Sequence, residues 1–126
     1  MTEHNIVIAE HSLYEIRLTA VCCGKDLSVT VCGGTHPHIG AVCLACGILP
    51  DGSQPKYSAT VNTITVMDHK DDVVARQLSA RLADRLHAVV TVAAGIHIDN
   101  ARPEELKILQ ENCLEASDRL LKELDK

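Results

Sequence analysis

The chain has 126 residues, enough for one domain with a single core, and we take residues 1–126 as that domain. Hydrophobic residues make up 46% and charged residues 23%, which excludes a disordered chain. The net charge of −5 argues against nucleic acid as a partner. Two tyrosines are the only aromatic residues, so the core must be aliphatic, and we expect a homo-oligomer to supplement it.

The sequence also bears on location. No stretch reaches the roughly 18 apolar residues of a membrane span. The first residues, Met-Thr-Glu-His-Asn, lack the basic and apolar segments of a signal peptide. We therefore expect a cytoplasmic protein with no membrane partner, in which the six cysteines stay reduced.

The first half of the chain reads as strands. Apolar and polar residues alternate over residues 13–22, and a turn leads from there into a second strand over 27–32. Residues 41–49 are nearly all apolar and predict a more deeply buried strand. A fourth strand rich in Thr and Val is expected over 57–67, and a short additional strand is conceivable near 6–9.

The hydrophobic period then changes to that of a helix. Val74, Leu78 and Leu82 recur every four residues and predict a helix over about 71–87, with Asp68 as its N-cap. A fifth strand follows over 89–98.

Asn100 is the expected cap of a final amphipathic helix. The order β-β-β-β-α-β-α predicts an α+β fold, a two-layer sandwich in which a mainly antiparallel sheet of about five strands carries two helices on one face. The strand–helix–strand unit over 57–98 suggests one parallel pair with a right-handed crossover.

The segment G-G-T-H-P-H-I-G at 33–40 is the first candidate site. Gly33 and Gly34 permit positive φ angles and close approach of a ligand, and consecutive N–H groups in such a turn can hold an anion. His36 and His38 add two imidazoles that the proline between them directs apart. A tight connection between strands with exposed histidines fits the same letters, so both interpretations stay open.

Two further stretches are candidates. His69 and Lys70 precede the first helix, where the dipole attracts anions, although this motif alone slightly favours a cluster of solvated capping side chains. In the strand over 89–98, one face carries only small side chains before His97. That face leaves room for a flat ligand ring or for a neighbouring subunit.

Metal and nucleophile chemistry find little support. Cys43 and Cys46 have zinc-like spacing, but positions i and i+3 of a strand face opposite sides, so we interpret them as core residues. A metal site formed by His36 or His38 with His69 and His97 is conceivable, but no spacing rule demands it, and we assign no metal ligand. The sequence lacks a nucleophile elbow, a Walker phosphate loop and a dinucleotide fingerprint, so we assign no catalytic residue.

Three motifs together, G-G-T-H-P-H-I-G at 33–40, H-K-D at 69–71 and T-V-A-A-G-I-H-I at 91–98, resemble a known family. In order, separation and local sequence they are similar to the prenylated-flavin chaperones, which are the small accessory proteins of gallate (hydroxyarylic acid) decarboxylase systems. The similarity runs from about residue 14 to the last helix.

The resemblance implies a non-catalytic chaperone that binds prenylated FMN, or FMN, and assists its maturation or its delivery to a prenylated-FMN-dependent decarboxylase. A flavin prenyltransferase is a second implied partner. The alternatives are a catalytic or a structural subunit of the decarboxylase itself.

Carried onto this chain, the resemblance and the motifs give a candidate cofactor-binding set. In that hypothesis the diglycine loop, the helix start and Lys70 hold the phosphate, and Thr91, Ala93 and Gly95 form a floor for the ring. The full set is Gly33, Gly34, Thr35, His36, Pro37, His38, Ile39, Gly40, His69, Lys70, Gly95 and His97.

Overall fold

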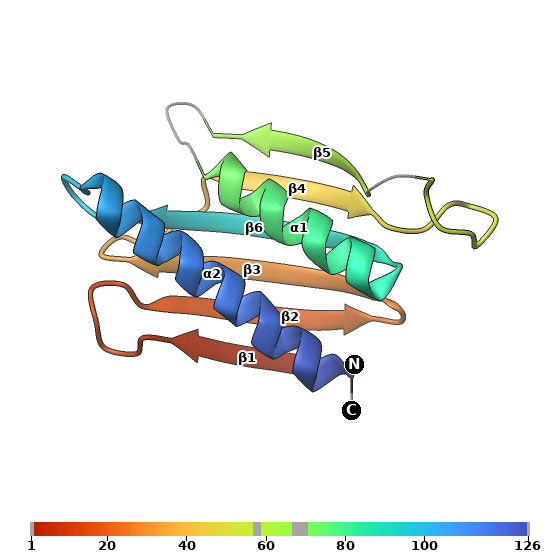
Figure 1. Ribbon diagram of the computed structural model, residues 1–126, viewed down its shortest axis with the longest axis horizontal. Helices are drawn as coiled ribbons and strands as arrows, with labels where there is room; N and C mark the ends of the chain where they lie inside the picture. The colour runs from red at the N-terminus through yellow and green to blue at the C-terminus, as the bar shows by residue number, and fades with distance from the viewer. Residues whose placement is uncertain (1, 57–58, 67–70, 126) are drawn as a thin grey trace.

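The computed structural model describes residues 2–56, 59–66 and 71–125. Within these residues, six strands and two helices form an α+β fold, as the sequence predicts (Figure 1). In chain order the elements are β1 (Glu3–Ile8), β2 (Ile16–Cys23), β3 (Asp26–Gly34), β4 (Ala41–Cys46), β5 (Thr60–Thr65), α1 (Asp72–Leu86), β6 (Val89–His97) and α2 (Pro103–Leu124). The sheet therefore has six strands rather than about five, because the N-terminal segment pairs with β2 as a full strand.

The strand order is β1-β2-β3-β6-β4-β5, and every neighbouring pair is antiparallel except one. The parallel pair joins β3 and β6. The sequence predicted a parallel pair within the strand–helix–strand unit over 57–98, which corresponds to β5, α1 and β6. That pairing is wrong, because β4 lies between β5 and β6. The apolar strand β6 takes a central place, where both of its edges are hydrogen-bonded, and the Thr-rich β5 stays at the edge.

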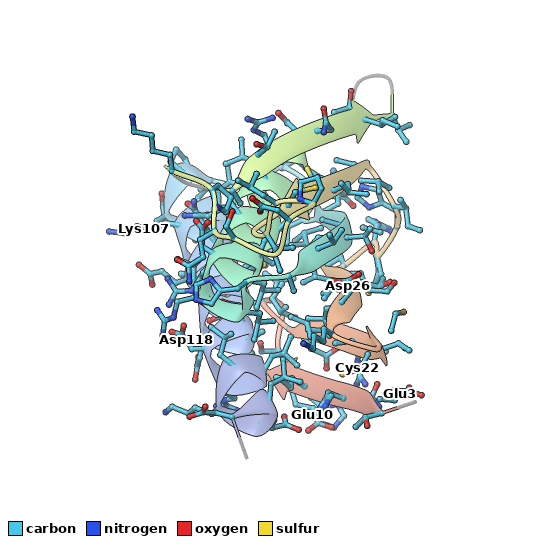
Figure 2. The ribbon with its side chains drawn as sticks, turned by 90° about the vertical axis from the view of Figure 1, so that its right-hand side faces the viewer. Glu3, Glu10, Cys22, Asp26, Lys107 and Asp118 are labelled. Atoms are coloured by element: carbon cyan, nitrogen blue, oxygen red, sulfur yellow. The ribbon has the colours of Figure 1, made fainter. Side chains whose placement is uncertain are left out.

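Both helices cover the same face of the sheet, and seen from the side the molecule has two layers (Figure 2). α1 packs on β4, β5 and β6, and α2 crosses over β1 and β2. The core between the layers is aliphatic, as the composition requires. Its largest fully buried side chains include Ile16, Leu18, Val29, Val31, Leu78, Leu82, Val90, Val92 and Leu120. Within the described residues, no helix is both long and apolar enough to cross a membrane.

No helix of the described residues covers the other face of the sheet, and this corrects the prediction for residues 41–49. β4 alternates, with Ala41, Cys43 and Ala45 buried under the helices. Val42 and Leu44 point the other way and are 40% and 39% exposed. The strand is uniformly apolar although only one of its faces is buried within this chain.

The helix caps also differ from those predicted. α1 begins at Asp72 with Asp71 as its N-cap residue, whereas Asp68 lies outside the described residues. α2 is capped at Arg102, whose backbone N–H donates to the Glu105 carboxylate at 3.1 Å. Asn100 instead adopts a left-handed conformation with φ of 53°, and it helps to turn the chain between β6 and α2.

Candidate functional site

The segment after β3 crosses the end of β6 and is bonded to it. The N–H of Thr35 donates to the His97 carbonyl at 2.8 Å, and the N–H of Gly40 donates to the Ala94 carbonyl at 2.8 Å. The N–H of Gly34 is also used, since it donates to the Glu15 carbonyl at 3.2 Å. These N–H groups are thus engaged within the chain, and they do not form the anion-binding concavity suggested by the diglycine.

Glycines let this crossing happen at close range. A Cβ at Gly95 would lie 1.7 Å from the His38 carbonyl oxygen, and one at Gly34 would lie 2.2 Å from that of His97. Gly34 also has a φ of 76°, which disfavours other residues. The space directly over Gly95 is therefore filled by the backbone of His38 and Ile39. Thr91 and Ala93, which share this face of β6, are half-buried.

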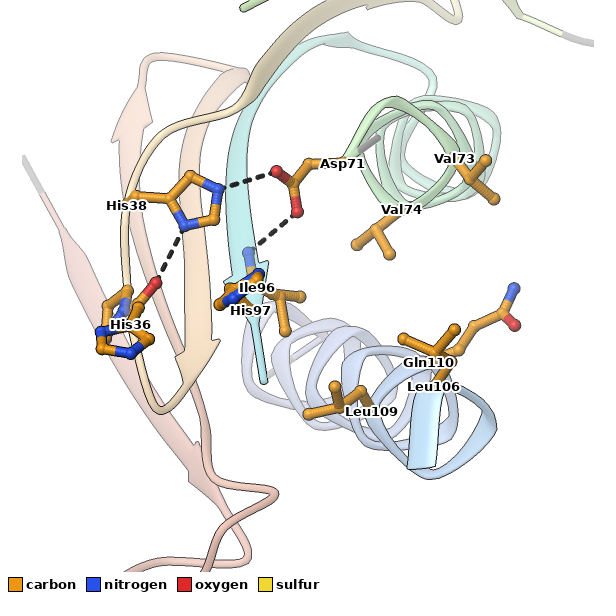
Figure 3. A pocket seen from close by; sticks show the side chains of 11 residues that line it. His36, His38, Asp71, Val73, Val74, Ile96, His97, Leu106, Leu109 and Gln110 are labelled. Atoms are coloured by element: carbon orange, nitrogen blue, oxygen red, sulfur yellow. Dashed lines mark hydrogen bonds and ion pairs between the residues drawn. The ribbon is translucent and has the colours of Figure 1, made fainter. Parts of the chain in front are cut away.

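A cavity of about 800 Å³ lies on the helix side of the sheet. It opens between the first turns of α1 and α2, beside the end of β6 (Figure 3). We call it the helix-start cavity. Its apolar lining is Val73, Val74, Ile96, Leu106 and Leu109, and its remaining lining is His36, Pro37, His38, Asp71, His97 and Gln110. An aliphatic hollow with a few convergent polar groups is the usual form of a small-molecule site.

His38 and Asp71 form a bonded pair at the border of this cavity. His38 Nδ1 lies 2.9 Å from the His36 carbonyl oxygen, and its Nε2 lies 2.9 Å from Asp71 Oδ2. Both partners can only accept hydrogen bonds, so the imidazolium, with two N–H groups, satisfies both of them. The bond to the His36 carbonyl, together with the Asp71 carboxylate, raises the pKa of His38 above its usual 6.5, although burial opposes the rise.

Asp71 is the link between the loop and the helix. Its side chain is buried, and its Oδ1 accepts the N–H of Ile96 at 2.9 Å while its Oδ2 meets His38. The carboxylate therefore does not cap α1 but ties the start of α1 to β6 and to the loop (Figure 3). Leaving a buried acceptor of this kind unpaired is costly, so the three segments are held in one arrangement.

A second histidine cluster lies at the exposed end of the site. Asp99 accepts from His97 Nε2 at 2.9 Å and from His36 Nε2 at 3.0 Å, and the two rings lie 5.7 Å apart. The hydrogen bond from His97 is the larger cause that lowers the pKa of Asp99, and the hydrogen bond from His36 adds to it. In the described part of the chain, no group of three or more His, Cys, Asp or Glu side chains is placed to hold a metal ion.

The structure thus brings His36, Pro37, His38 and His97 together at the cavity. Gly33, Gly34, Gly40 and Gly95 shape the backbone around it, Thr35 donates its hydroxyl to the His97 carbonyl, and the Ile39 side chain is exposed elsewhere. His69 and Lys70 lie outside the described residues.

Sequence reasoning missed three parts of the site. Asp71 looks like no more than a favourable charge in the first helical turn, although it is the last letter of the H-K-D motif. Asp99 follows His97 by two residues, a spacing that could have suggested a bonded pair. The apolar walls from α1 and α2 carry no local signal, because Leu106 and Val73 look like ordinary members of amphipathic helices.

Comparison with known proteins adds the family. A family model described as the prenylated flavin chaperone LpdD-like domain matches residues 10–125. The chain belongs to this family. The resemblance noted from the three motifs is thereby confirmed, and it extends to the whole described fold except β1.

Two known proteins are similar to this LpdD-like chain, one in sequence and one in structure. Protein LpdD of Lactiplantibacillus plantarum is 29% identical over 92 residues, which are 71% of this chain and 62% of that protein. The chain therefore aligns with less than two thirds of that relative's length. A chain in the crystal structure of a chaperone complex for yeast 20S proteasome assembly has a TM-score of 0.57 at 17% identity, over 99% of this chain and 97% of that one. At this identity the likeness concerns the fold alone.

Proposed function

We propose that this protein is a non-catalytic chaperone that binds prenylated FMN in the helix-start cavity and assists its maturation or its delivery to a prenylated-FMN-dependent decarboxylase. The observation that carries the proposal is the cavity itself, an aliphatic hollow bordered by three histidines in a chain of this family. A flavin prenyltransferase is the proposed source of the cofactor, and unmodified FMN is the alternative ligand.

The residues of the cavity fit a prenylated flavin ring. Val74, Ile96 and Leu109 offer an aliphatic surface against which a flat, partly apolar ring system can pack. Gln110 and the histidines offer hydrogen-bonding groups for the polar edge of the ring. The volume of about 800 Å³ lies within the usual range of roughly 300–1,000 Å³ for small-molecule sites.

The phosphate requires positive charge or free N–H donors. The first backbone N–H groups of α1 have no intrahelical partner and carry the positive end of the helix dipole. The His38 imidazolium lies beside them, bonded to the N-cap residue Asp71. We therefore assign the phosphate to this end of the cavity, and we retain His69 and Lys70 as proposed contributors because they directly precede it in the sequence.

The test is a spectrum of the protein purified after co-production with a flavin prenyltransferase. The proposal expects flavin-like absorbance that follows the protein, and a colourless protein that also fails to bind in titration would overturn it. Turnover of a hydroxybenzoate by the loaded protein alone would instead support the alternative of a catalytic subunit.

A variant pair locates the binding site. Leu106→Glu puts a carboxylate into the lining of the cavity at a position already 56% exposed, so folding should survive while cofactor binding weakens by about 10-fold or more. Leu13→Glu is the matched control, since Leu13 is also a partly exposed leucine but does not line the cavity. Equal binding by both variants would place the cofactor elsewhere.

A further inference from the structure

A second cavity, of about 520 Å³, lies between the C-terminal turns of α1 and α2. We call it the helix-end cavity. Its lining is Arg81, Arg85 and Leu86 from α1, and Asp118, Leu121, Lys122, Leu124 and Asp125 from the end of α2. We propose that this cavity binds a small carboxylic acid, whose carboxylate pairs with the basic side chains and whose apolar body lies against the leucines. The inference does not rest on the flavin, because no described residue lines both cavities.

Arg81 is bonded on one side only. Its Nη2 donates to Oδ1 of Asp118 on α2, which is labelled in Figure 2. Its Nε is buried, yet it has no hydrogen-bond partner within the described residues. An orphaned buried donor calls for an explanation, and a partner outside the chain supplies one. Because no hydrogen bond to Nε has to break, the guanidinium can turn towards a ligand in the cavity at little cost.

Two further cations line the same cavity. Arg85 follows Arg81 by one helical turn, and Lys122 follows Asp118 by one turn on α2. Both are exposed, and in the part of the chain that the structure describes the side chain of neither forms an ion pair or a hydrogen bond. Basic side chains in the last turn of a helix stabilise its dipole. That role accounts for Arg85 and Lys122 but not for the hollow between them or for the unpaired Nε of Arg81.

Charge selects the class of ligand. Three basic and two acidic side chains line the cavity, which leaves one net positive charge. Both helices also end here, so the partial negative charge of their last carbonyl groups opposes a polyanion. A monoanion therefore matches the cavity, whereas a doubly charged phosphate does not. A carboxylate also fits the planar guanidinium of Arg81 or Arg85 through two parallel hydrogen bonds.

The leucines define the rest of the ligand. Leu86, Leu121 and Leu124 are half-buried, pack against the core and provide the apolar part of the lining. An apolar group that covers them is removed from water together with them, which favours binding. The volume of about 520 Å³ lies within the usual range of roughly 300–1,000 Å³ for small-molecule sites. The ligand is therefore a small acid with an aliphatic or aromatic body rather than a bare anion.

The experiment is an NMR titration of the backbone amides of the full chain with phenylpropionate, which joins one carboxylate to an apolar body. We expect saturable shifts centred on residues 81–87 and 117–125, with a dissociation constant below about 1 mM. Phenylpropionamide has the same shape without the charge, and it should bind about 10-fold more weakly or worse. Acetate and inorganic phosphate should also bind more weakly, the first for want of a body and the second because of its charge.

Two variants test the cations. Arg85→Gln and Lys122→Gln each remove one positive charge at an exposed position, so the fold should survive while the affinity for phenylpropionate falls by about 10-fold. Arg119→Gln is the matched control, since Arg119 is an exposed base of α2 that does not line the cavity and donates to Glu115 instead. This control should bind phenylpropionate like the wild type.

The proposal is overturned if phenylpropionate at about 10 mM leaves residues 81–87 and 117–125 unshifted. Equal affinity for the acid and for its amide would also overturn it, because the cavity would then not recognise charge. Wild-type affinity in both Arg85→Gln and Lys122→Gln would restrict these side chains to the stabilisation of the helix ends. Shifts centred on Val73 and Leu106 would place the acid in the helix-start cavity and equally contradict the proposal.

Discussion

His38 and Asp71 are the two residues on which the geometry of the site depends most. One carboxylate joins the loop, the start of α1 and the end of β6 through bonds of 2.9 Å to His38 and to the Ile96 N–H. Because the pKa of His38 is raised, protonation of the ring and the order of the loop are linked.

Asp71→Asn tests this link. The amide can still accept from the Ile96 N–H, but it presents an NH₂ group to His38, so the neutral ring becomes the better partner. We expect the pKa of His38, followed by NMR, to fall towards or below 6.5. Asp72→Asn is the control and should leave it unchanged. An unaltered His38 titration in Asp71→Asn would show that the pair does not set the charge of the ring.

The same pair gives stability a pH dependence of defined sign. The folded-state pKa of His38 is raised, so its contribution is complete below about pH 6.5 and is lost as the pH rises through the raised value. Denaturant unfolding of the wild type should therefore show this loss as the pH rises above about 6.5, and Asp71→Asn should show a smaller loss, because it keeps only the bond to the His36 carbonyl.

At the scale of the elements, the start of α2 is fixed by one carboxylate. Glu105 accepts from the Arg102 backbone N–H at 3.1 Å, from Arg102 Nε at 3.2 Å and from the Tyr14 hydroxyl at 3.1 Å. The Arg102 backbone bond is the largest cause that lowers the pKa of Glu105, followed by the Arg102 side chain. Glu105 thus ties α2 to the residues that lead into β2.

Glu105→Gln should lower the melting temperature by about 5 °C at neutral pH. A depressed carboxylate pKa stabilises the fold above its unfolded value and loses that effect as the pH falls through the folded value, so the difference between wild type and variant should shrink below about pH 4.5. Tyr14→Phe removes one of the three donors and should have a smaller effect. A variant that melts with the wild type would show that the cap is dispensable.

Elements were also what the sequence predicted best. The alternation of apolar and polar residues falls on observed strands, and the four-residue repeat of Leu78 and Leu82 falls on α1. The order of the strands in the sheet was harder to predict from the sequence. The position of β6 between β3 and β4 depends on pairings between segments distant in sequence, which no local pattern encodes. For the same reason the sequence indicated the histidines that line the cavity, whereas it did not indicate the apolar walls that two helices contribute.

At the scale of the whole molecule, the reactivity of the cysteine thiols measures local and global unfolding of the chain. Burial raises the pKa of Cys113 to about 12, and the charge of Asp71 adds to the rise. Cys43 is equally buried under α1, whereas Cys23 is exposed beside a turn. Since the thiolate is the reactive form, Cys113 is protected both from contact and from ionisation.

We therefore expect a thiol reagent at pH 8 to modify Cys23 first, and Cys43 and Cys113 only at the rate of global unfolding. Mass spectrometry of the labelled peptides over time measures this order. Labelling of Cys113 at a rate near that of Cys23 would mean that α2 detaches from the sheet while the rest stays folded.

The central position of β6 has a consequence for how the protein is made. No strand of the three-stranded unit β1-β2-β3 pairs with a strand of the hairpin β4-β5. Each unit pairs with β6 instead, through β3 and through β4. During synthesis the first five strands therefore leave the ribosome as two unconnected sheet fragments, with Val29 and Cys43 uncovered. The sheet closes only when residues 89–97 emerge, so the nascent chain passes through a long interval in which exposed edges are open to wrong partners.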